Sequence, residues 1–291
     1  MKIGLFVNSN RDIGYECAYT AAQSILRYGA VPVLRPSDKG NFPHDLAGVV
    51  FEDFDKAGAE VLVSIGGDGT FLSMVAQYGN SDYEFVGINK GNLGFLAKIG
   101  ADNIDENIRR IVEHDYKLIN RSRLNVKVFS KDGVLKAEDV CLNDCSLSRG
   151  AKLHVARFLL KVNGQVVERI FGDGLVVSTA TGSTSYSLSA GGPILMPELR
   201  NIIITTVCSR TLHSYTYVLS PESTVEVVIE KFETRPLICL DGHDLVDLES
   251  DDVVSITVCD KDIKAVDLAP DGFFADVRHK IIQRGSLYEN N

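Results

Sequence analysis

The sequence predicts two domains: an N-terminal α/β domain with a doubly wound, Rossmann-like sheet, and a mostly antiparallel, β-sandwich-like C-terminal domain. Residues 1–121 alternate apolar runs with stretches of helical periodicity, the pattern of a parallel sheet covered by helices. Residues 122–262 carry successive strand patterns separated by turn signals. Residues 263–291 include a helix-like tail, and we expect this segment to pack back on the first domain. The 291 residues, 45% of them hydrophobic, suffice for two buried cores.

The first domain begins with a strand at 2–7 (KIGLFV) and continues into a helix within 15–29. Gly29 stands where a helix C-terminal cap is expected, before a second strand at 30–34. The remaining expected elements are a strand at 59–65, a helix at 70–79, a strand at 83–88 and a helix at 104–116.

The second domain contains two hairpin patterns. Residues 123–140 predict two strands around Asp132-Gly133, and residues 156–170 predict two around Asn163-Gly164, a dipeptide typical of tight hairpin turns. Further β segments are expected at 215–219, 223–230, 235–242 and 253–268, before a helix at 272–282.

Composition excludes several classes of function. The net charge is −9 and no Lys/Arg cluster stands out, which argues against nucleic acid as a partner. The N-terminal apolar stretch is too short for a signal peptide and no run approaches membrane-spanning length, so we expect a cytoplasmic protein without a membrane partner. The cysteines are scattered singly and Cys141 and Cys145 lack zinc-site spacing, so we expect reduced core thiols and no protein-ligated metal.

The stretch GGDGT, Gly66 to Thr70, directly follows the apolar run 61–65. Bare backbone amides after a strand, next to the positive end of a helix, are typical of a phosphate-binding loop. The stretch also fits a plain strand-to-helix turn in which Asp68 caps the helix. It is neither a Walker A loop nor a GxGxxG dinucleotide fingerprint, so a nucleotide would bind here by other means.

Two further stretches carry polar groups in apolar surroundings. Residues 171–193 (FGDGLVVSTATGSTSYSLSAGGP) are dense in hydroxyls and glycines, and ordering such a segment is costly unless it binds something. A flexible surface loop is the alternative. Asn143 and Asp144 follow a strand pattern and suit hydrogen bonds to an adenine edge and ribose hydroxyls, although an Asx turn explains an isolated Asn-Asp pair equally simply.

The order of GGDGT, GINKGNLGFLAKI (87–99), LND and the long 171–193 stretch resembles the NAD kinase family, over nearly the whole chain. The tail GFFADVRHKI is similar to the closing helix of that family. The resemblance implies ATP-dependent transfer of phosphate to the 2′-hydroxyl of the adenosine ribose of NAD, giving NADP, with Mg²⁺ or another divalent cation accompanying ATP. It also implies a homodimer or homotetramer whose site is completed across the subunit interface.

The resemblance assigns roles to individual residues. Asp68 would contact the acceptor hydroxyl as the catalytic residue. The residues implied for the ATP phosphates are Gly66, Gly67, Gly69, Thr70 and Asn89; those implied for NAD or for its surroundings are Asn143, Asp144, Asp173, Thr181, Thr184, Ser185, Tyr186, Ser189 and His243.

Two roles remain open for Asp68. An aspartate with an ordinary pKa near 4 is a weak base at neutral pH, but neighbouring phosphates and a second carboxylate such as Asp144 would raise that pKa. Alternatively, Asp68 mainly orients the ribose hydroxyl, which suffices for phosphoryl transfer because that reaction depends on positioning and charge stabilisation. We favour orientation with partial proton acceptance.

The sequence departs from the family pattern in several places. Asp144 stands where glutamate is usual, Ala180 where proline is usual, and residues 206–220 differ most, with Ser209 and Arg210 in place of Pro-His. His243 follows Asp241 and Gly242 in the turn where the family has glutamine, and a solvated turn residue is its simpler interpretation. Two alternatives therefore stay open: an NAD-binding regulatory protein with weakened catalysis, and a GGDGT kinase for another acceptor.

Overall fold

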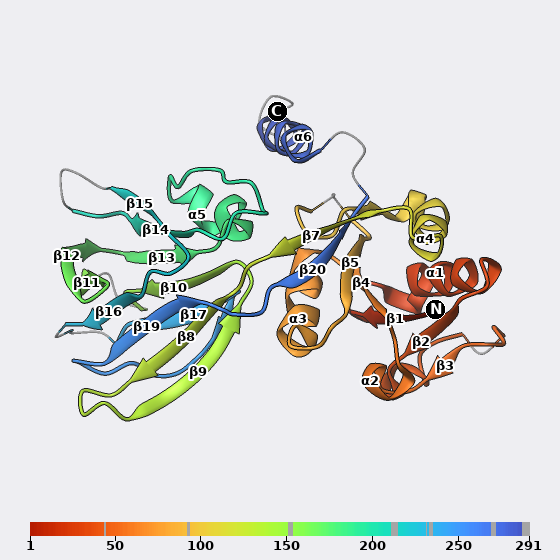
Figure 1. Cartoon of the computed structure of the whole chain (residues 1–291), viewed down its shortest axis with the longest axis horizontal. Helices are drawn as coiled ribbons and strands as arrows, with labels where there is room; N and C mark the ends of the chain where they lie inside the picture. Colours follow the sequence, from red (N-terminus) through yellow and green to blue (C-terminus); the bar gives the residue numbers. More distant parts are fainter. Residues whose placement is uncertain are drawn as a thin grey trace. The chain divides into compact units, whose positions relative to one another are not determined.

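The computed structural model describes residues 1–43, 45–91, 94–150, 154–210, 215–230, 232, 235–268 and 272–286 (Figure 1). The chain divides into two compact units. Unit 1 comprises Met1–Ile119 and the described residues from Ile263 onward, and unit 2 comprises Asn120–Asp262. Unit 1 has a largely parallel sheet with helices, and unit 2 has two antiparallel sheets, so the predicted fold class is confirmed.

The sheet of unit 1 has the strand order β3-β2-β1-β4-β5-β20-β7, with β6 paired to β5. Strand β1 runs parallel to β2 and to β4, and β5 runs parallel to β4 and to β20. The strands are β1 (Lys2–Val7), β2 (Val31–Leu34), β3 (Val50–Phe51), β4 (Val61–Gly66), β5 (Glu84–Asn89), β6 (Ile99–Gly100), β7 (Lys117–Arg121) and β20 (Ile263–Asp267).

Helices cover both faces of this sheet (Figure 1). Ile3, Leu5 and Val7 of β1 belong to the core that α1 and α4 cover. Phe6 points to the other face, where its ring meets Tyr78 of α3 edge to face at 6.2 Å. The helices are α1 (Glu16–Arg27), α2 (Phe54–Ala57), α3 (Asp68–Tyr78), α4 (Ile104–Val112) and α6 (Phe273–Ser286), with short 3₁₀ turns at Ile13–Tyr15, Pro36–Asp38 and Ala101–Asn103.

Unit 2 is built from two six-stranded antiparallel sheets, ordered β15-β14-β13-β10-β17-β18 and β12-β11-β16-β19-β8-β9. Alternate residues of β8, namely Leu124, Val126 and Val128, are fully buried, and strands of both sheets contribute to the same core. This is the period-2 pattern of sheets that pack face to face. The strands are β8 (Leu124–Phe129), β9 (Leu135–Cys141), β10 (Asp144–Ser148), β11 (Ala156–Val162), β12 (Gln165–Gly172), β13 (Gly174–Ser178), β14 (Ile202–Val207), β15 (Thr216–Leu219), β16 (Val225–Ile229), β17 (Leu237–Leu240), β18 (His243–Asp244) and β19 (Val253–Val258).

Two sequence-based expectations have distinct outcomes. The hairpin between β11 and β12 turns at Asn163 and Gly164, whose φ angles of 51° and 76° are both positive, as a type I′ turn requires. The β pattern expected at 253–268 forms two strands: β19 stays in unit 2, whereas β20 joins unit 1 beside β5. Alternating burial fixes which face of a strand is apolar but not which sheet the strand enters.

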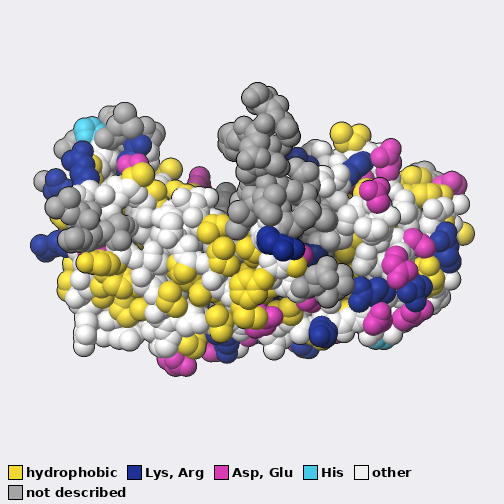
Figure 2. Space-filling model, turned by 90° about the horizontal axis from the view of Figure 1, so that it is seen from above, with side chains coloured by type: hydrophobic (Ala, Val, Ile, Leu, Met, Phe, Trp, Pro, Cys, Tyr) yellow, Lys and Arg dark blue, Asp and Glu magenta, His cyan; other side chains and the backbone are white. Residues whose placement is uncertain are grey.

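No helix in the described ranges has the length and apolar character needed to cross a bilayer. On the face drawn in Figure 2, basic and acidic side chains alternate over unit 1, in the right-hand part of the view, instead of forming a single-sign patch.

Candidate active site

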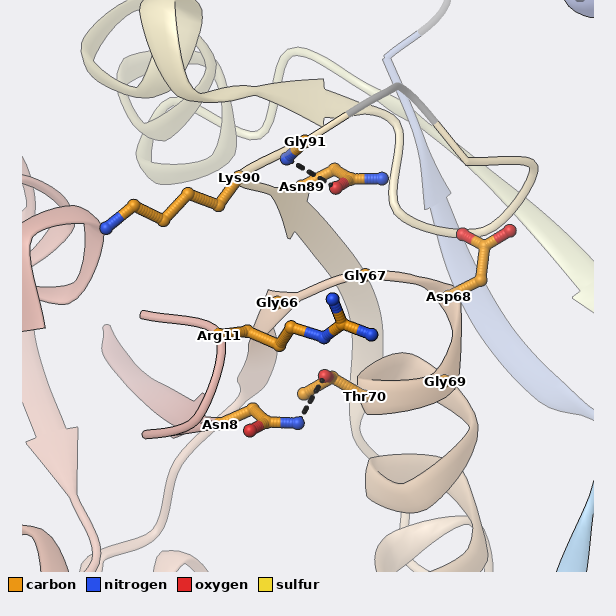
Figure 3. A pocket seen from close by; sticks show the side chains of 10 residues that line it. All are labelled: Asn8, Arg11, Gly66, Gly67, Asp68, Gly69, Thr70, Asn89, Lys90 and Gly91. Carbon is orange, nitrogen blue, oxygen red and sulfur yellow. Dashed lines mark hydrogen bonds between the residues drawn. The ribbon is translucent and has the colours of Figure 1, made fainter. Parts of the chain in front are cut away.

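A cavity of about 610 Å³ lies at the carboxyl edge of the unit 1 sheet (Figure 3). Strands β1 and β5 flank β4 in parallel, so the segments that follow these three strands meet at one edge. Open α/β sheets bind their ligands at this edge. The cavity is lined by Asn8, Arg11, Gly66, Gly67, Asp68, Gly69, Thr70, Asn89, Lys90 and Gly91.

All five residues predicted for the ATP phosphates line this cavity. Gly66 ends β4 and Gly67 is the N-cap of α3, so the positive end of the helix dipole borders the space. A Cβ atom at Gly66 would lie 2.2 Å from Thr70 Oγ1, which makes glycine necessary there. Asn8 Nδ2 donates to the same Thr70 oxygen at 3.2 Å, and Asn89 Oδ1 accepts the Gly91 amide at 2.9 Å.

Two basic residues that sequence reasoning missed also line the cavity. The Arg11 guanidinium points into it (Figure 3) and has no hydrogen bond or ion pair with any described residue. Lys90 extends away, and its Nζ lies 3.3 Å from Asp12 Oδ1 and 2.9 Å from Glu16 Oε2. Arg11 is therefore the side chain available to neutralise an anion. The sequence did contain one indication of this role: Arg11 lies four residues beyond β1, and β1 pairs in parallel with β4, which leads into the GGDGT loop.

Asp68 is turned away from Arg11 (Figure 3). Its Oδ2 accepts the Phe95 amide at 2.9 Å, and its Oδ1 accepts the amides of Leu96 at 3.1 Å and Ala97 at 2.8 Å. The N-cap of α3 is Gly67, without a side-chain cap bond, so the helix-cap interpretation of Asp68 is wrong. A carboxylate offers about four acceptor positions, so three amides fix its orientation and leave about one position open.

The segment that holds Asp68 comes from the GNLGFLAKI stretch, of which residues 92 and 93 lie outside the described residues. A Cβ atom at Gly94 would lie 1.8 Å from Asp68 Oδ1, so only glycine admits the carboxylate here. The Gly94 amide donates to Ala97 O at 3.2 Å and closes a tight turn. The stretch was recognised as part of the resemblance, but nothing local in its sequence indicated Asp68 as its partner.

In unit 2, Asn143 and Asp144 are held by the carboxylate of Asp241. Its oxygens accept the backbone amides of Leu142 and Asn143, both at 2.8 Å, and of Asp144 at 3.0 Å. Asp241 has a left-handed φ of 48°, and its own amide donates to Asp144 O at 3.0 Å. The Asp-Gly-His turn therefore shapes the Asn-Asp segment that precedes it by almost a hundred residues.

The Asp144 carboxyl is 6% exposed and lies near a second carboxylate. Burial, and then the charge of Asp241, raises the pKa of Asp144 to about 7, while a hydrogen bond with Ser185 opposes the rise. Burial also raises the pKa of Asp241, against the effect of its three amide donors and of His243. Asp144 consequently changes its charge near neutral pH.

The hydroxyl-rich stretch forms a 3₁₀ turn, Thr181–Thr184, followed by the one-turn helix α5, Tyr186–Ser189. Thr181 and Thr184 are buried; Arg121 Nη1 donates to Thr181 Oγ1 at 3.3 Å, and Thr184 Oγ1 donates to Thr181 O at 3.4 Å. Tyr186 and Ser189 are exposed. This stretch is thus a structured segment rather than the flexible loop considered as the alternative.

Three further hydroxyls order the segment, those of Thr179, Ser183 and Ser187. Thr179 Oγ1 donates to Leu142 O at 2.6 Å and accepts the Gly182 amide at 3.0 Å, and the Thr179 amide donates to Asn143 O at 2.9 Å, which ties the segment to residues 142 and 143. Ser183 Oγ accepts the Leu195 amide at 3.1 Å, and Ser187 Oγ lies 3.1 Å from Thr205 Oγ1.

The other predicted residues are placed as follows. The Asp173 carboxylate accepts from Arg149 Nε at 2.8 Å, and His243 lies exposed in β18. In the atypical 206–220 stretch, residues 211–214 lie outside the described residues, the Arg210 amide donates to Phe171 O at 2.7 Å, and Tyr215 is exposed.

Among the described residues, no three His, Cys, Asp or Glu side chains are placed to hold a metal ion.

Comparisons with known proteins agree with this architecture. Residues 3–116 match the ATP-NAD kinase N-terminal domain and residues 142–268 the ATP-NAD kinase C-terminal domain. The NAD kinase of Ruminiclostridium cellulolyticum is 32% identical over 97% of this chain and 98% of its own, and that of Acetivibrio thermocellus is 32% identical over 98% of each.

Two solved structures share the fold. Yeast NADH kinase complexed with NADH has a TM-score of 0.82 at 22% identity, covering 92% of this chain and 84% of its own. An Archaeoglobus fulgidus NAD kinase in complex with ATP has a TM-score of 0.70 at 24% identity, covering 92% and 94%. On the domain matches and the near full-length relatives, the chain belongs to the ATP-NAD kinase family.

Proposed function

We propose that this chain is a NAD kinase, which transfers the γ-phosphate of ATP to the 2′-hydroxyl of the adenosine ribose of NAD and releases NADP and ADP. The observation that carries the proposal in the structure is the GGDGT cavity, where Arg11 and the N-terminus of α3 border the same space as Asp68. The family membership supplies the donor and the acceptor.

The donor phosphates are assigned to the cavity of unit 1. Backbone amides at the start of α3 and the helix dipole favour negative charge, and the glycines allow phosphate oxygens to approach the backbone. The Arg11 guanidinium adds a planar set of donors that matches two phosphate oxygens at once. Because the Arg11 guanidinium has no hydrogen-bond or ion-pair partner among the described residues, a phosphate gains its hydrogen bonds without breaking an existing pair.

Asp68 is assigned the acceptor hydroxyl. Its three amide bonds hold the carboxylate in one orientation, and its remaining acceptor position receives the hydroxyl hydrogen of the ribose. Asp68 thereby orients the attacking oxygen and accepts its proton as the phosphoryl group transfers. Because phosphoryl transfer depends mainly on alignment and charge stabilisation, this role accounts for a large share of the catalysis.

The donor set at the cavity fits a magnesium ion carried by ATP. Oxygens of Thr70 and Asn89 border the space, and Mg²⁺ prefers oxygen ligands, of which water and phosphate oxygens supply several. When bound, the ion would neutralise charge on the phosphate oxygens.

NAD recognition is assigned to unit 2. The Asn143 and Asp144 segment offers amide and carboxyl groups for adenine and ribose, and the Thr181 to Thr184 turn is tied to it through Thr179. We further propose a homodimer or homotetramer, in which the exposed side chains of Tyr186, Ser189 and His243 complete the partner's NAD site.

The test is to incubate the purified protein with NAD, ATP and Mg²⁺ and to detect NADP with an NADP-specific dehydrogenase. Phosphorus NMR of the product distinguishes a 2′-phosphate from other positions. Diacylglycerol and sphingosine, each in competition with NAD, test the rival acceptors of GGDGT kinases. NADP formation supports the proposal, whereas tight NAD binding without turnover supports the regulatory alternative.

A further inference from the structure

Helix α6 contacts the segment that holds Asp68. Residues 94–98, here called the amide segment, donate three backbone hydrogen bonds to the Asp68 carboxylate, and α6 binds this segment at both of its ends. We propose that Lys280 and Asp276 of α6 are positioning residues for Asp68, acting through the amide segment. This inference rests on the proposed function, in which Asp68 orients the acceptor hydroxyl.

The first anchor is Lys280. Its side chain is 8% exposed, its Nζ donates to the backbone oxygen of Gly94, and the same ammonium lies 4.3 Å from the centroid of the Phe95 ring. A buried cation is costly unless it is paired, and here a carbonyl and an aromatic face supply the compensation. Displacing Gly94 or Phe95 would remove that compensation, so Lys280 resists movement of this end of the segment.

The second anchor is Asp276, at the other end of the amide segment. Lys98 Nζ lies 3.1 Å from Asp276 Oδ2 and 3.1 Å from Asp267 Oδ1, the last residue of β20. All three side chains are less than a third exposed, so water and salt screen the pairs less than they would on an open surface. Asp276 and Lys280 are four residues apart and therefore share one face of α6.

The geometry makes the amides of Phe95, Leu96 and Ala97 a bridge between these two anchors. Gly94, next to the first anchor, already approaches Asp68 so closely that a Cβ atom would overlap Oδ1. A small shift of the segment therefore moves the carboxylate itself. Misplacing a reacting group by about 1 Å costs up to about 100-fold in rate, so α6 influences catalysis without touching a substrate.

The first experiment compares Lys280→Met with Arg278→Met. The Lys280 change keeps the apolar stem and removes the ammonium, and Arg278 is an exposed cation on the same helix. We expect Lys280→Met to lower kcat about 10-fold while KM for ATP and for NAD stays within about 2-fold. The reason is that the change displaces the Asp68 carboxylate, which acts on the transfer step and not on substrate binding. Lys280→Arg should restore most of the rate, and Arg278→Met should match the parent protein.

A second readout separates positioning from general stability. Hydrogen exchange of a peptide that covers residues 94–98 should accelerate about 10-fold or more in Lys280→Met, while a β1 peptide should not change. In an Asp68→Asn background, adding Lys280→Met should reduce the residual kcat no further, because both changes act through one carboxylate. If Lys280→Met does not fold, Asp276→Asn tests the opposite anchor in the same assays.

Three results would overturn the inference: unchanged exchange at residues 94–98, an unchanged kcat in Lys280→Met, or an equal loss of rate in the parent and Asp68→Asn backgrounds. Failure of the proposed function is distinguishable, since the parent protein would then make no NADP. In that case the exchange experiment still measures whether α6 holds the amide segment.

Discussion

Replacing Asp144 by Asn tests the carboxylate pair of unit 2, in which Asp144 is buried and Asp241 is partly exposed. In the folded chain the pKa of Asp144 is raised from 3.8 to about 7, by burial first and by Asp241 second, so the folded state holds the proton more tightly than the unfolded state. This contribution to stability is complete below pH ~4 and is lost as pH rises through about 7. Between pH ~4 and ~7 the free energy of unfolding falls by about 1.4 kcal/mol per pH unit, and above pH ~7 this loss levels off. From pH ~5.5 to ~8.5 the total loss is therefore about 2 kcal/mol, nearly all of it below pH ~7.

Asn has nearly the same shape as Asp but does not ionise, so the variant does not undergo this loss. The free energy of unfolding of Asp144→Asn, measured relative to the parent, should therefore be about 2 kcal/mol higher at pH ~8.5 than at pH ~5.5. Urea unfolding followed by far-UV circular dichroism measures this, since the chain has no tryptophan. With a slope of ~3 kcal/mol per molar urea, the relative midpoint moves by about 0.7 M. Asp132→Asn, at an exposed turn carboxyl, is the control. A difference between variant and parent that is independent of pH would refute the reasoning.

Three further predictions follow from single contacts. Gly94→Ala forces the Asp68 carboxylate away from its amides and should lower kcat about 100-fold in the NADP assay, while the fold seen by circular dichroism persists; an unchanged kcat would contradict it. Arg11→Met should raise KM for ATP about 10- to 100-fold and leave NAD binding by calorimetry unchanged, because it removes charge-assisted hydrogen bonds to phosphate; an unchanged KM for ATP would count against the donor assignment. Asp241→Ala leaves three amides without their acceptor and should destabilise the chain by about 3 kcal/mol in urea unfolding; a loss below about 1 kcal/mol would argue against its organising role.

The fold was largely predictable because its signals are local. Alternating burial along β8 and the Asn163-Gly164 turn are each encoded within a few residues. The exception is the place of β20: its pattern shows that it is a strand, and residues 263–291 are expected to pack on the first domain, but the pattern does not show that β20 pairs with β5. That choice depends on pairing partners almost two hundred residues away, and no short-range periodicity records it.

The candidate site was predictable where it lies in one continuous stretch. Gly66 to Thr70 line one cavity because a strand, a turn and a helix N-terminus follow each other directly. Arg11 was missed because it reaches this cavity only through the parallel pairing of β1 with β4. The hydrogen bonds that the Asp68 and Asp241 carboxylates accept from backbone amides were missed for the same reason. Each of these bonds joins segments that are remote in the sequence.

The most direct test of the central claim compares the parent protein with Asp68→Asn in two measurements, single-turnover NADP formation and NAD affinity by calorimetry. Asn keeps the shape and one acceptor oxygen but removes the carboxylate charge. We predict that NADP formation falls by about three orders of magnitude while the dissociation constant for NAD changes less than about 3-fold. A variant that makes NADP at the parent rate would contradict a catalytic role for Asp68, and a matching loss of NAD affinity would show that Asp68 serves binding rather than the transfer step.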